Sequence, residues 1–509
     1  MPSSRADAGP PPVLVVALVL AVVAGVVLRA WSRSDLWLDE ALTVNIASLP
    51  VGEMVDALER DGHPPLYYLL LHGWMRLVGS GDLAVRTLSG LLGVVALPLM
   101  ALVGRRHGGA PVAVAALVIL TTSPFAVRYA TEVRMYALVI VLVLLGWLAL
   151  RQARSAPSAP WLVAVAAVSG LLLLTHYWAF FLLAAVGGAL AWEAWRVGPG
   201  DLRRTATRLA VGVAAGGILF LPWLPSFLVQ AGSTGTPWGR PERPATVLMV
   251  TLRDFGGGAN AEAELLGFLL LALVAIGLLG RAVGSSRVEL DLRTRPGVRP
   301  EAVVVGATLG IGVVAGYVFD SAFASRYAAI ILPLVVLMAA VGVVQLPRAS
   351  VQAGVLAVLA VLGLLGGARN LVTQRTQAGQ VASAVTATAS SGDVVAYCPD
   401  QLGPAVSRLL PDDLRQLALA DDVAPHFVDW VDYADRMAEA DTAAFAAEVD
   451  ELAGDRTVWL VWSGGYRTLE GTCEALTNDL AVLRPDRTVM VESGEQFEHA
   501  WLFRFGPTG

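Results

Sequence analysis

Long apolar segments recur along most of this 509-residue chain and leave little choice of fold. A helix needs about 20 apolar residues to cross the hydrocarbon core of a bilayer. Charged residues make up only 15% of the sequence, whereas about a quarter is usual in a soluble domain. We therefore expect a polytopic α-helical membrane protein. Eleven spans are predicted, at residues 13–30, 83–104, 110–127, 133–150, 160–175, 177–195, 208–229, 263–280, 301–319, 327–346 and 350–368.

The distribution of arginine predicts the orientation of these spans, because cytoplasmic loops concentrate basic residues. The sequence contains no lysine, so arginine carries all of this signal. The arginines at alternate span ends are Arg105, Arg106, Arg151, Arg154, Arg196, Arg203, Arg204, Arg208, Arg281, Arg287, Arg293, Arg295, Arg299 and Arg348. We expect these ends to face the cytoplasm of a cytoplasmic (inner) membrane. The first outer loop, residues 31–82, then lies on the extracytoplasmic face.

Three regions follow from this reading. Residues 13–30 are expected to be a retained span and not a signal peptide, because Arg29-Ala30-Trp31-Ser32 is a poor cleavage site. Residues 1–12 then form a cytoplasmic N-terminus. Residues 13–370 form the transmembrane domain, and residues 371–509 form an extracytoplasmic α/β domain. In the last region, expected helices (374–390, 403–410, 442–452, 469–483) alternate with expected strands (393–398, 456–462, 488–491, 500–505).

Such alternation predicts a small, mostly parallel sheet layered with helices. No Gly-x-Gly-x-x-Gly fingerprint follows a strand, so neither nucleotide nor nucleic acid is expected as a partner. Both cysteines, Cys398 and Cys473, lie in this domain. A disulfide is compatible with an extracytoplasmic location, and two buried free thiols are the alternative.

The first outer loop contains adjacent carboxylates, Asp39 and Glu40. Ionisable groups at the membrane surface are expensive to bury and are therefore candidates for function. We interpret Asp39 as a general base with Glu40 beside it. The alternative is that both only cap the following helix or face solvent.

Two further outer segments carry arginine and tyrosine. The first segment is residues 128–136. Its Glu132 and Tyr136 are four residues apart, so we expect them to lie on the same face of one helix. Arg134 points elsewhere, and its planar guanidinium suits a lipid phosphate. The second segment ends in Arg326 and Tyr327, so two arginines could clamp one phosphate; helix-end pairing and interfacial anchoring are the alternatives.

Two histidines lie at the same face. His63 precedes Pro64-Pro65, which predicts a rigid turn, and we consider it a candidate substrate contact. His176 and Tyr177 follow a span, where an aromatic belt is the alternative to binding.

Five segments form a distinctive combination: Trp37-Leu38-Asp39-Glu40, His63-Pro64-Pro65-Leu66-Tyr67-Tyr68, Leu83-Ala84-Val85-Arg86, Tyr129 to Tyr136 and Ser325-Arg326-Tyr327. This combination resembles the GT-C integral-membrane glycosyltransferases. Within them it is most similar to glycosyltransferase family 39, the protein O-mannosyltransferase and aminoarabinose transferase group. The resemblance covers about residues 13–370. It implies a polyprenyl-phosphate sugar donor, inversion at the anomeric carbon and an extracytoplasmic active site.

The resemblance also implies residue roles. Asp39 takes the place of the family's catalytic base, and Arg134 and Arg326 match donor-phosphate contacts. The donor- and acceptor-binding candidates are Glu40, His63, Tyr129, Glu132, Arg134, Tyr136, His176, Tyr177, Arg326 and Tyr327. The lysine that some relatives use near the phosphate has no counterpart. No cofactor is required for this chemistry, although Asp39 and Glu40 could recruit a divalent cation.

The leading hypothesis is therefore an enzyme that transfers a sugar to a hydroxyl of a protein, glycan or lipid acceptor. Mannose is the favoured sugar and a pentose the next choice. A transporter or flippase of a lipid-linked saccharide is the alternative, although charges gather at span ends and no internal repeat is evident. A third class, a scaffold anchored by the helices, would not need eleven spans.

Overall fold

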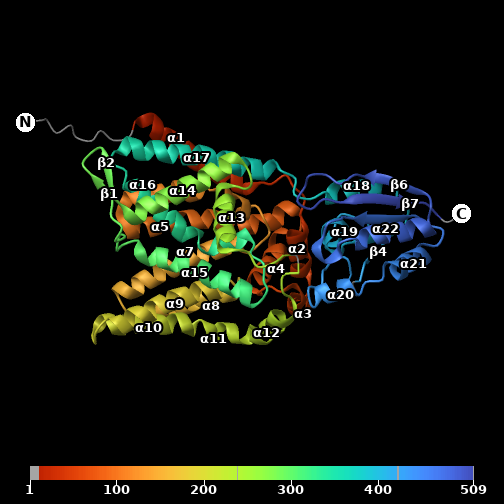
Figure 1. Cartoon of the computed structure of the whole chain (residues 1–509), viewed down its shortest axis with the longest axis horizontal. Coiled ribbons are helices and arrows are strands. Elements are labelled where there is room, and N and C mark those ends of the chain that lie inside the picture. The colour runs from red at the N-terminus through yellow and green to blue at the C-terminus, as the bar shows by residue number, and fades with distance from the viewer. Residues whose placement is uncertain (1–10, 238, 421–423, 508–509) are drawn as a thin grey trace, which may run out of the picture.

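The computed structural model describes residues 11–237, 239–420 and 424–507, and the predicted cytoplasmic N-terminus falls mainly outside these ranges. A bundle of helices and a smaller C-terminal domain lie end to end (Figure 1). The bundle contains the helices α1 (Pro12–Val27), α5 (Asp82–Thr122), α6 (Pro124–Ala130), α7 (Tyr136–Ser155), α8 (Ala159–Leu173), α9 (Ala179–Arg196), α10 (Asp201–Ala215), α11 (Gly217–Phe220), α12 (Leu224–Ser233), α13 (Pro244–Gly256), α14 (Ala261–Leu279), α15 (Arg299–Val318), α16 (Leu332–Val344) and α17 (Ala349–Val372).

Seven helical segments in the described part of the chain are long and apolar enough to cross a membrane. They are Pro12–Ala30, Asp82–Thr122, Tyr136–Ser155, Asp201–Ser233, Ala261–Leu279, Arg299–Val318 and Ala349–Val372. The predicted spans at 160–175 and 327–346 correspond to the shorter apolar helices α8 and α16. The protein is thus a multi-pass membrane protein, and the count of eleven stays a prediction.

The predicted span 83–104 and most of the predicted span 110–127 fall within the 41-residue helix α5. Gly108 and Gly109 interrupt it with non-helical backbone angles, and Gly109 has a φ of +79° that favours glycine. A Cβ on Gly104 would lie 2.9 Å from the Cα of Ala113. Nine residues along a straight helix would separate these positions by about 13 Å, so the chain reverses here and the two halves pack side by side.

Close helix contacts in the bundle depend on glycine. A Cβ on Gly342 of α16 would overlap the backbone oxygen of Leu273, and one on Gly277 of α14 would overlap that of Met338. Small residues let membrane helices approach closely where no hydrophobic effect drives them together. Helices α14 and α16 therefore pack backbone against backbone.

Three short helices cover the end of the bundle that faces the C-terminal domain (Figure 1). They are α2 (Leu38–Ser48), α3 (Val51–Asp61) and α4 (Leu66–Val78). Gly62 ends α3 in a left-handed conformation, with φ of 80°, and Pro64 and Pro65 lead directly into α4. At the opposite end of the bundle lies the hairpin of β1 (Gly280–Val283) and β2 (Arg287–Leu290), which carries some of the clustered arginines.

The C-terminal domain contains a five-stranded sheet with the order β4-β3-β5-β7-β6. Its strands are β3 (Val394–Cys398), β4 (Arg415–Ala418), β5 (Val458–Trp462), β6 (Arg487–Val491) and β7 (Trp501–Phe505). Its helices are α18 (Ala378–Thr388), α19 (Gly403–Ser407), α20 (Tyr433–Ala438), α21 (Thr442–Ala453) and α22 (Thr472–Leu483). Strand β4 and helix α20 were not anticipated from the sequence.

The expectation of a mostly parallel sheet is wrong. Strand β3 pairs in parallel with β4 and β5, but β7 is antiparallel to both β5 and β6. No helix separates β6 from β7, so the short connection returns the chain in the antiparallel sense. The sheet is mixed. Cys398 at the end of β3 and Cys473 in α22 form a disulfide, with their Cα atoms 5.5 Å apart.

The two parts of the molecule share extensive contacts. Helix α19 packs against α2, and the backbone N–H of Trp430 donates to the carbonyl of Arg60 at 3.0 Å. Near the end of the bundle, the N–H of Arg375 donates to Ser34 Oγ at 2.9 Å. The C-terminal domain therefore rests directly on the segments that carry the candidate site.

Candidate functional site

A cavity of about 490 Å³ lies where α2, α3 and the turn before α9 meet α12 and α15. One part of its wall is polar and charged, with Asp39, Asp61, His63, Arg134 and Arg326. Another part is apolar and includes Phe180, Phe181, Phe227, Val313 and Phe319. Phe319 and its neighbour Val318 are exposed, so the apolar part is continuous with the surface of the bundle.

Asp39 occupies the first turn of α2, between two guanidinium groups. Its Oδ2 lies 3.5 Å from Arg326 Nη2 and 4.0 Å from Arg134 Nε. The side chain is 17% exposed, and Oδ2 has no hydrogen-bond donor among the described residues. Asp39 lines the cavity, and the two cations stabilise its negative charge.

Arg134 is fixed from several directions. Its Nη1 donates to Thr43 Oγ1 at 2.8 Å and to the backbone oxygen of Asp39 at 3.3 Å. Its Nη2 lies 2.8 Å from Nε2 of His63. The arginine is almost fully buried, which preorganises its charge at the head of the cavity.

His63 is oriented by Asp61, which lies two residues earlier. Nδ1 of His63 is 2.9 Å from Asp61 Oδ2, and Tyr68 donates to the same oxygen at 2.7 Å. Burial alone would raise the pKa of Asp61, but His63 and Arg134 lower it overall. Nε2 of His63 faces the Arg134 guanidinium, and Nδ1 faces the Asp61 carboxylate.

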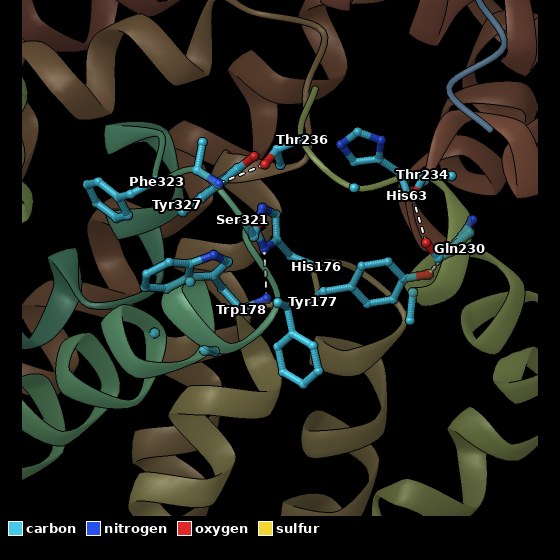
Figure 2. Close-up of a pocket in the computed structure, with 18 of the residues that line it drawn as sticks. His63, His176, Tyr177, Trp178, Gln230, Thr234, Thr236, Ser321, Phe323 and Tyr327 are labelled. Carbon is cyan, nitrogen blue, oxygen red and sulfur yellow. Dashed lines mark hydrogen bonds between the residues drawn. The ribbon is translucent and has the colours of Figure 1, made fainter. Parts of the chain in front are cut away.

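Neutral polar groups line the cavity beyond these charges. Figure 2 shows His63 and Thr234 on one side, Tyr327 and Trp178 on the other, and Tyr177 between them. Tyr177 donates to Gln230 Oε1, and Gln230 Nε2 donates to the carbonyl of Leu58 at 2.7 Å. Thr236 and Ser321 complete this part of the wall. Such hydroxyl and amide groups are suited to the hydroxyl groups of a sugar.

His176 lies in the turn between α8 and α9 and lines the same cavity. Its Nδ1 accepts from the N–H of Trp178 at 3.1 Å. Its ring contacts Tyr327 at 5.3 Å and Tyr136 at 5.7 Å between centroids. His176 therefore joins the cavity wall to a buried aromatic cluster.

Glu40 points away from the cavity into a buried ion network. Its carboxylate accepts from Arg86 Nε at 2.9 Å and Nη2 at 2.8 Å, and Oε1 also accepts from the N–H of Val133 at 3.0 Å. Arg375 Nη1 lies 3.9 Å from Glu40 and 2.6 Å from Glu132 Oε1. Glu40 and Glu132 thus fasten the first loop to the bundle and do not line the cavity.

The helical-face argument for Glu132 and Tyr136 is wrong, because residues 131–135 form turns between α6 and α7. Glu132 instead bonds Arg128 and Arg375. Tyr136 and Tyr129 are buried with their rings 4.7 Å apart, and neither lines the cavity. Of the predicted site residues, the cavity brings together Asp39, His63, Arg134, His176, Tyr177, Arg326 and Tyr327.

The geometry also bears on whether Asp39 and Glu40 could bind a divalent cation together. Because Glu40 is engaged by Arg86, its carboxylate does not converge with that of Asp39 on one point. Within the described ranges, no group of three or more His, Cys, Asp or Glu side chains is arranged to hold an ion. The charges beside Asp39 are supplied by arginine.

Several residues at this site were not selected from the sequence. Asp61 is the clearest, since its position two residues before His63 would have suggested a carboxylate–histidine pair. Gln230, Arg375 and Trp430 come from distant parts of the chain and carry no local motif. Their roles follow only from the tertiary structure.

Comparison with solved structures shows that the chain shares its fold with ArnT. ArnT from Cupriavidus metallidurans bound to undecaprenyl phosphate matches with a TM-score of 0.60 at 14% identity, over 96% of this chain and 97% of that chain. Its apo structure matches equally. The S. cerevisiae Pmt1-Pmt2 complex bound to the sugar donor matches with a TM-score of 0.33 at 15% identity, over 55% of this chain and 41% of that chain.

The sequence adds an independent finding. Residues 62–225 match the family described as dolichyl-phosphate-mannose-protein mannosyltransferase. No curated protein matches the sequence. The family match over part of the chain and the shared fold both agree with the resemblance expected from the sequence.

Proposed function

We propose that the protein is an inverting glycosyltransferase that moves a sugar from a polyprenyl-phosphate donor to a hydroxyl acceptor. The observation that carries this proposal is the position of Asp39, which lines a cavity with an apolar extension and whose Oδ2 lies between Arg134 and Arg326. A lipid-linked sugar phosphate needs these three features together: cations for the phosphate, polar groups for the sugar and an apolar path for the chain.

In the proposed reaction, Asp39 accepts the proton of the acceptor hydroxyl as its oxygen attacks the anomeric carbon. The bond between this carbon and the phosphate oxygen breaks, and the phosphate leaves with the bonding electrons. Arg134 and Arg326 stabilise the charge that develops on it. One displacement inverts the anomeric configuration. No cofactor is needed for these steps, since a phosphate leaving group requires little acid assistance.

The family match supports mannose as the sugar, with a pentose as the second choice, because the matched family is described by dolichyl-phosphate-mannose. The undecaprenyl phosphate bound to ArnT supports a polyprenyl carrier. The acceptor is a hydroxyl of a protein, glycan or lipid. Trp430 of the C-terminal domain lines the cavity, which supports a role for this domain in orienting the acceptor.

We place the site on the extracytoplasmic side of the inner membrane. The hairpin with Arg281 and Arg287 lies at the other end of the bundle, which the arginine distribution assigns to the cytoplasm. The disulfide between Cys398 and Cys473 supports the same orientation, because disulfides persist in oxidising compartments.

The test is the Asp39→Asn variant, assayed for transfer from polyprenyl-phosphate mannose and the corresponding pentose donor. Loss of the base should lower kcat roughly 10²- to 10⁴-fold. The matched control is Asp320→Asn, an exposed acid in the loop after α15 that does not line the cavity. Near-normal turnover by Asp39→Asn would remove Asp39 from the mechanism. Net flux of lipid-linked sugar in vesicles, without a covalent product, would instead support transport.

A further inference from the structure

Helix α2 begins without a capping side chain of its own. Its N-cap residue, Trp37, makes no side-chain cap hydrogen bond. The free N–H of Leu38, in the first turn, instead donates to Glu498 Oε2 at 2.7 Å. The acceptor comes from the C-terminal domain, 460 residues along the chain. Asp39, the proposed base, is the residue that follows Leu38.

Glu498 is held in place by backbone hydrogen bonds. Its N–H donates to the carbonyl of Arg375 at 2.8 Å, and its carbonyl accepts from the N–H of Gln377 at 3.0 Å. The preceding Phe497 packs edge-on against Trp37, with ring centroids 5.5 Å apart. The segment 375–377 and residues 497–498 thus form a clasp around the start of α2.

From this geometry we infer that Glu498 is a positioning residue for the transfer reaction: it fixes the first turn of α2 and so places the Asp39 carboxylate against the bound donor. The inference rests on the proposed function. Asp39 must lie within hydrogen-bond reach of the acceptor hydroxyl, and displacement of a catalytic group by about 1 Å can cost about a hundredfold in rate.

The charges around Glu498 indicate which form of the residue performs this role. Asp39 and Glu40 face it from α2, and Tyr466 lies near it within the C-terminal domain. Burial, opposed by the Leu38 hydrogen bond and reinforced by Asp39, raises the pKa of Glu498 to about 8. At neutral pH the carboxyl is therefore mainly protonated. It accepts from Leu38 without adding a negative charge beside Asp39.

A glutamine is a close substitute for this protonated form, whereas an alanine removes the acceptor. We expect Glu498→Gln to keep kcat within about threefold of wild type at pH 7, and Glu498→Ala to lower kcat about 10- to 100-fold. The KM for the donor should stay within about threefold in both, because Arg134 and Arg326 are untouched. Glu495→Ala, an exposed acid in the same loop, is the matched control and should behave as wild type.

A second readout does not depend on turnover. In hydrogen–deuterium exchange of the detergent-solubilised full chain, the peptide covering residues 36–42 should exchange faster in Glu498→Ala than in Glu498→Gln. Wild-type kcat in Glu498→Ala would overturn the inference, as would equal losses in the two variants. If wild-type protein transfers no sugar, the proposed function fails, and the exchange experiment still decides whether Glu498 holds the start of α2.

Discussion

At the scale of the residue, adjacent carboxylates have opposite surroundings. Asp39 lines the cavity and lies between two arginines, whereas Glu40 is fully buried against Arg86. The pair was selected from the sequence because ionisable groups at a membrane surface are costly to bury and are therefore candidates for function. The sequence could not assign the two roles, because these depend on Arg86 and Arg326, which are far away along the chain.

The buried position of Glu40 makes a stability prediction. Glu40→Gln leaves Arg86 without its charged partner in a buried site, and removing one member of such a pair typically costs about 3–5 kcal/mol. We expect a clear fall in the thermal unfolding temperature in detergent. The matched control is Glu53→Gln on the exposed side of α3, which should unfold close to the wild-type temperature. Equal temperatures for both variants would contradict the ion network.

Glu498 makes a prediction about pH. Its pKa is raised to about 8 in the folded protein, so folding favours its protonated form. The associated stability is fully present below the pKa of an unfolded glutamate, about 4.3, and is lost as pH rises through about 8. Glu498→Gln should therefore become more stable relative to wild type as pH increases from 5 to 9. Unfolding temperatures that differ by a constant amount over this range would contradict it.

At the scale of the element, the apolar runs predicted the helices of the bundle well, because each long apolar run has to be buried against other helices or against lipid. All eleven predicted runs correspond to helical segments, although only some are long enough to count as spans. The chain reversal at Gly108-Gly109 was anticipated as a loop, since two glycines stop a helix readily. A break was anticipated between the spans 110–127 and 133–150, but it extends to residue 135, and its sequence has no glycine or proline to mark that end.

The close contact of α14 and α16 leads to a prediction about stability. Gly342→Leu would force side-chain atoms into the backbone of α14 at Leu273, and overpacking typically costs about 1–3 kcal/mol or more. A lower unfolding temperature in detergent is the expected result. Gly354→Leu on α17 is the control, since a Cβ there meets nothing within 4 Å. If both variants unfold at the wild-type temperature, the two helices do not pack this closely.

At the scale of the whole molecule, the C-terminal domain is the part that the sequence described least well. Alternating segments predicted α/β composition but not the order or sense of the strands, because the sense depends on which strands become neighbours in the sheet, and here β7 pairs antiparallel with both β5 and β6. The contacts of this domain with the first loop, through Arg375 and Glu498, were not predictable from local patterns. They join segments more than 300 residues apart.

Removing the disulfide tests how much it stabilises the C-terminal domain. Replacing both Cys398 and Cys473 with serine opens a link across 75 residues, and loss of a native disulfide typically costs about 2–5 kcal/mol. The C-terminal domain should become more sensitive to limited proteolysis. Wild-type protein should shift on a non-reducing gel after reduction, and the double variant should not. Identical migration of wild-type protein with and without reductant would show two free thiols.

The hydrogen bond between Leu38 and Glu498 also has a consequence for biosynthesis. A nascent chain that has inserted its bundle still lacks the acceptor for the start of α2, because Glu498 follows the bundle in the sequence. The loop that carries Asp39 thus reaches its final form only after residue 498 has been translated. A product that stalls before residue 498 would carry Asp39 without the support that completes its surroundings.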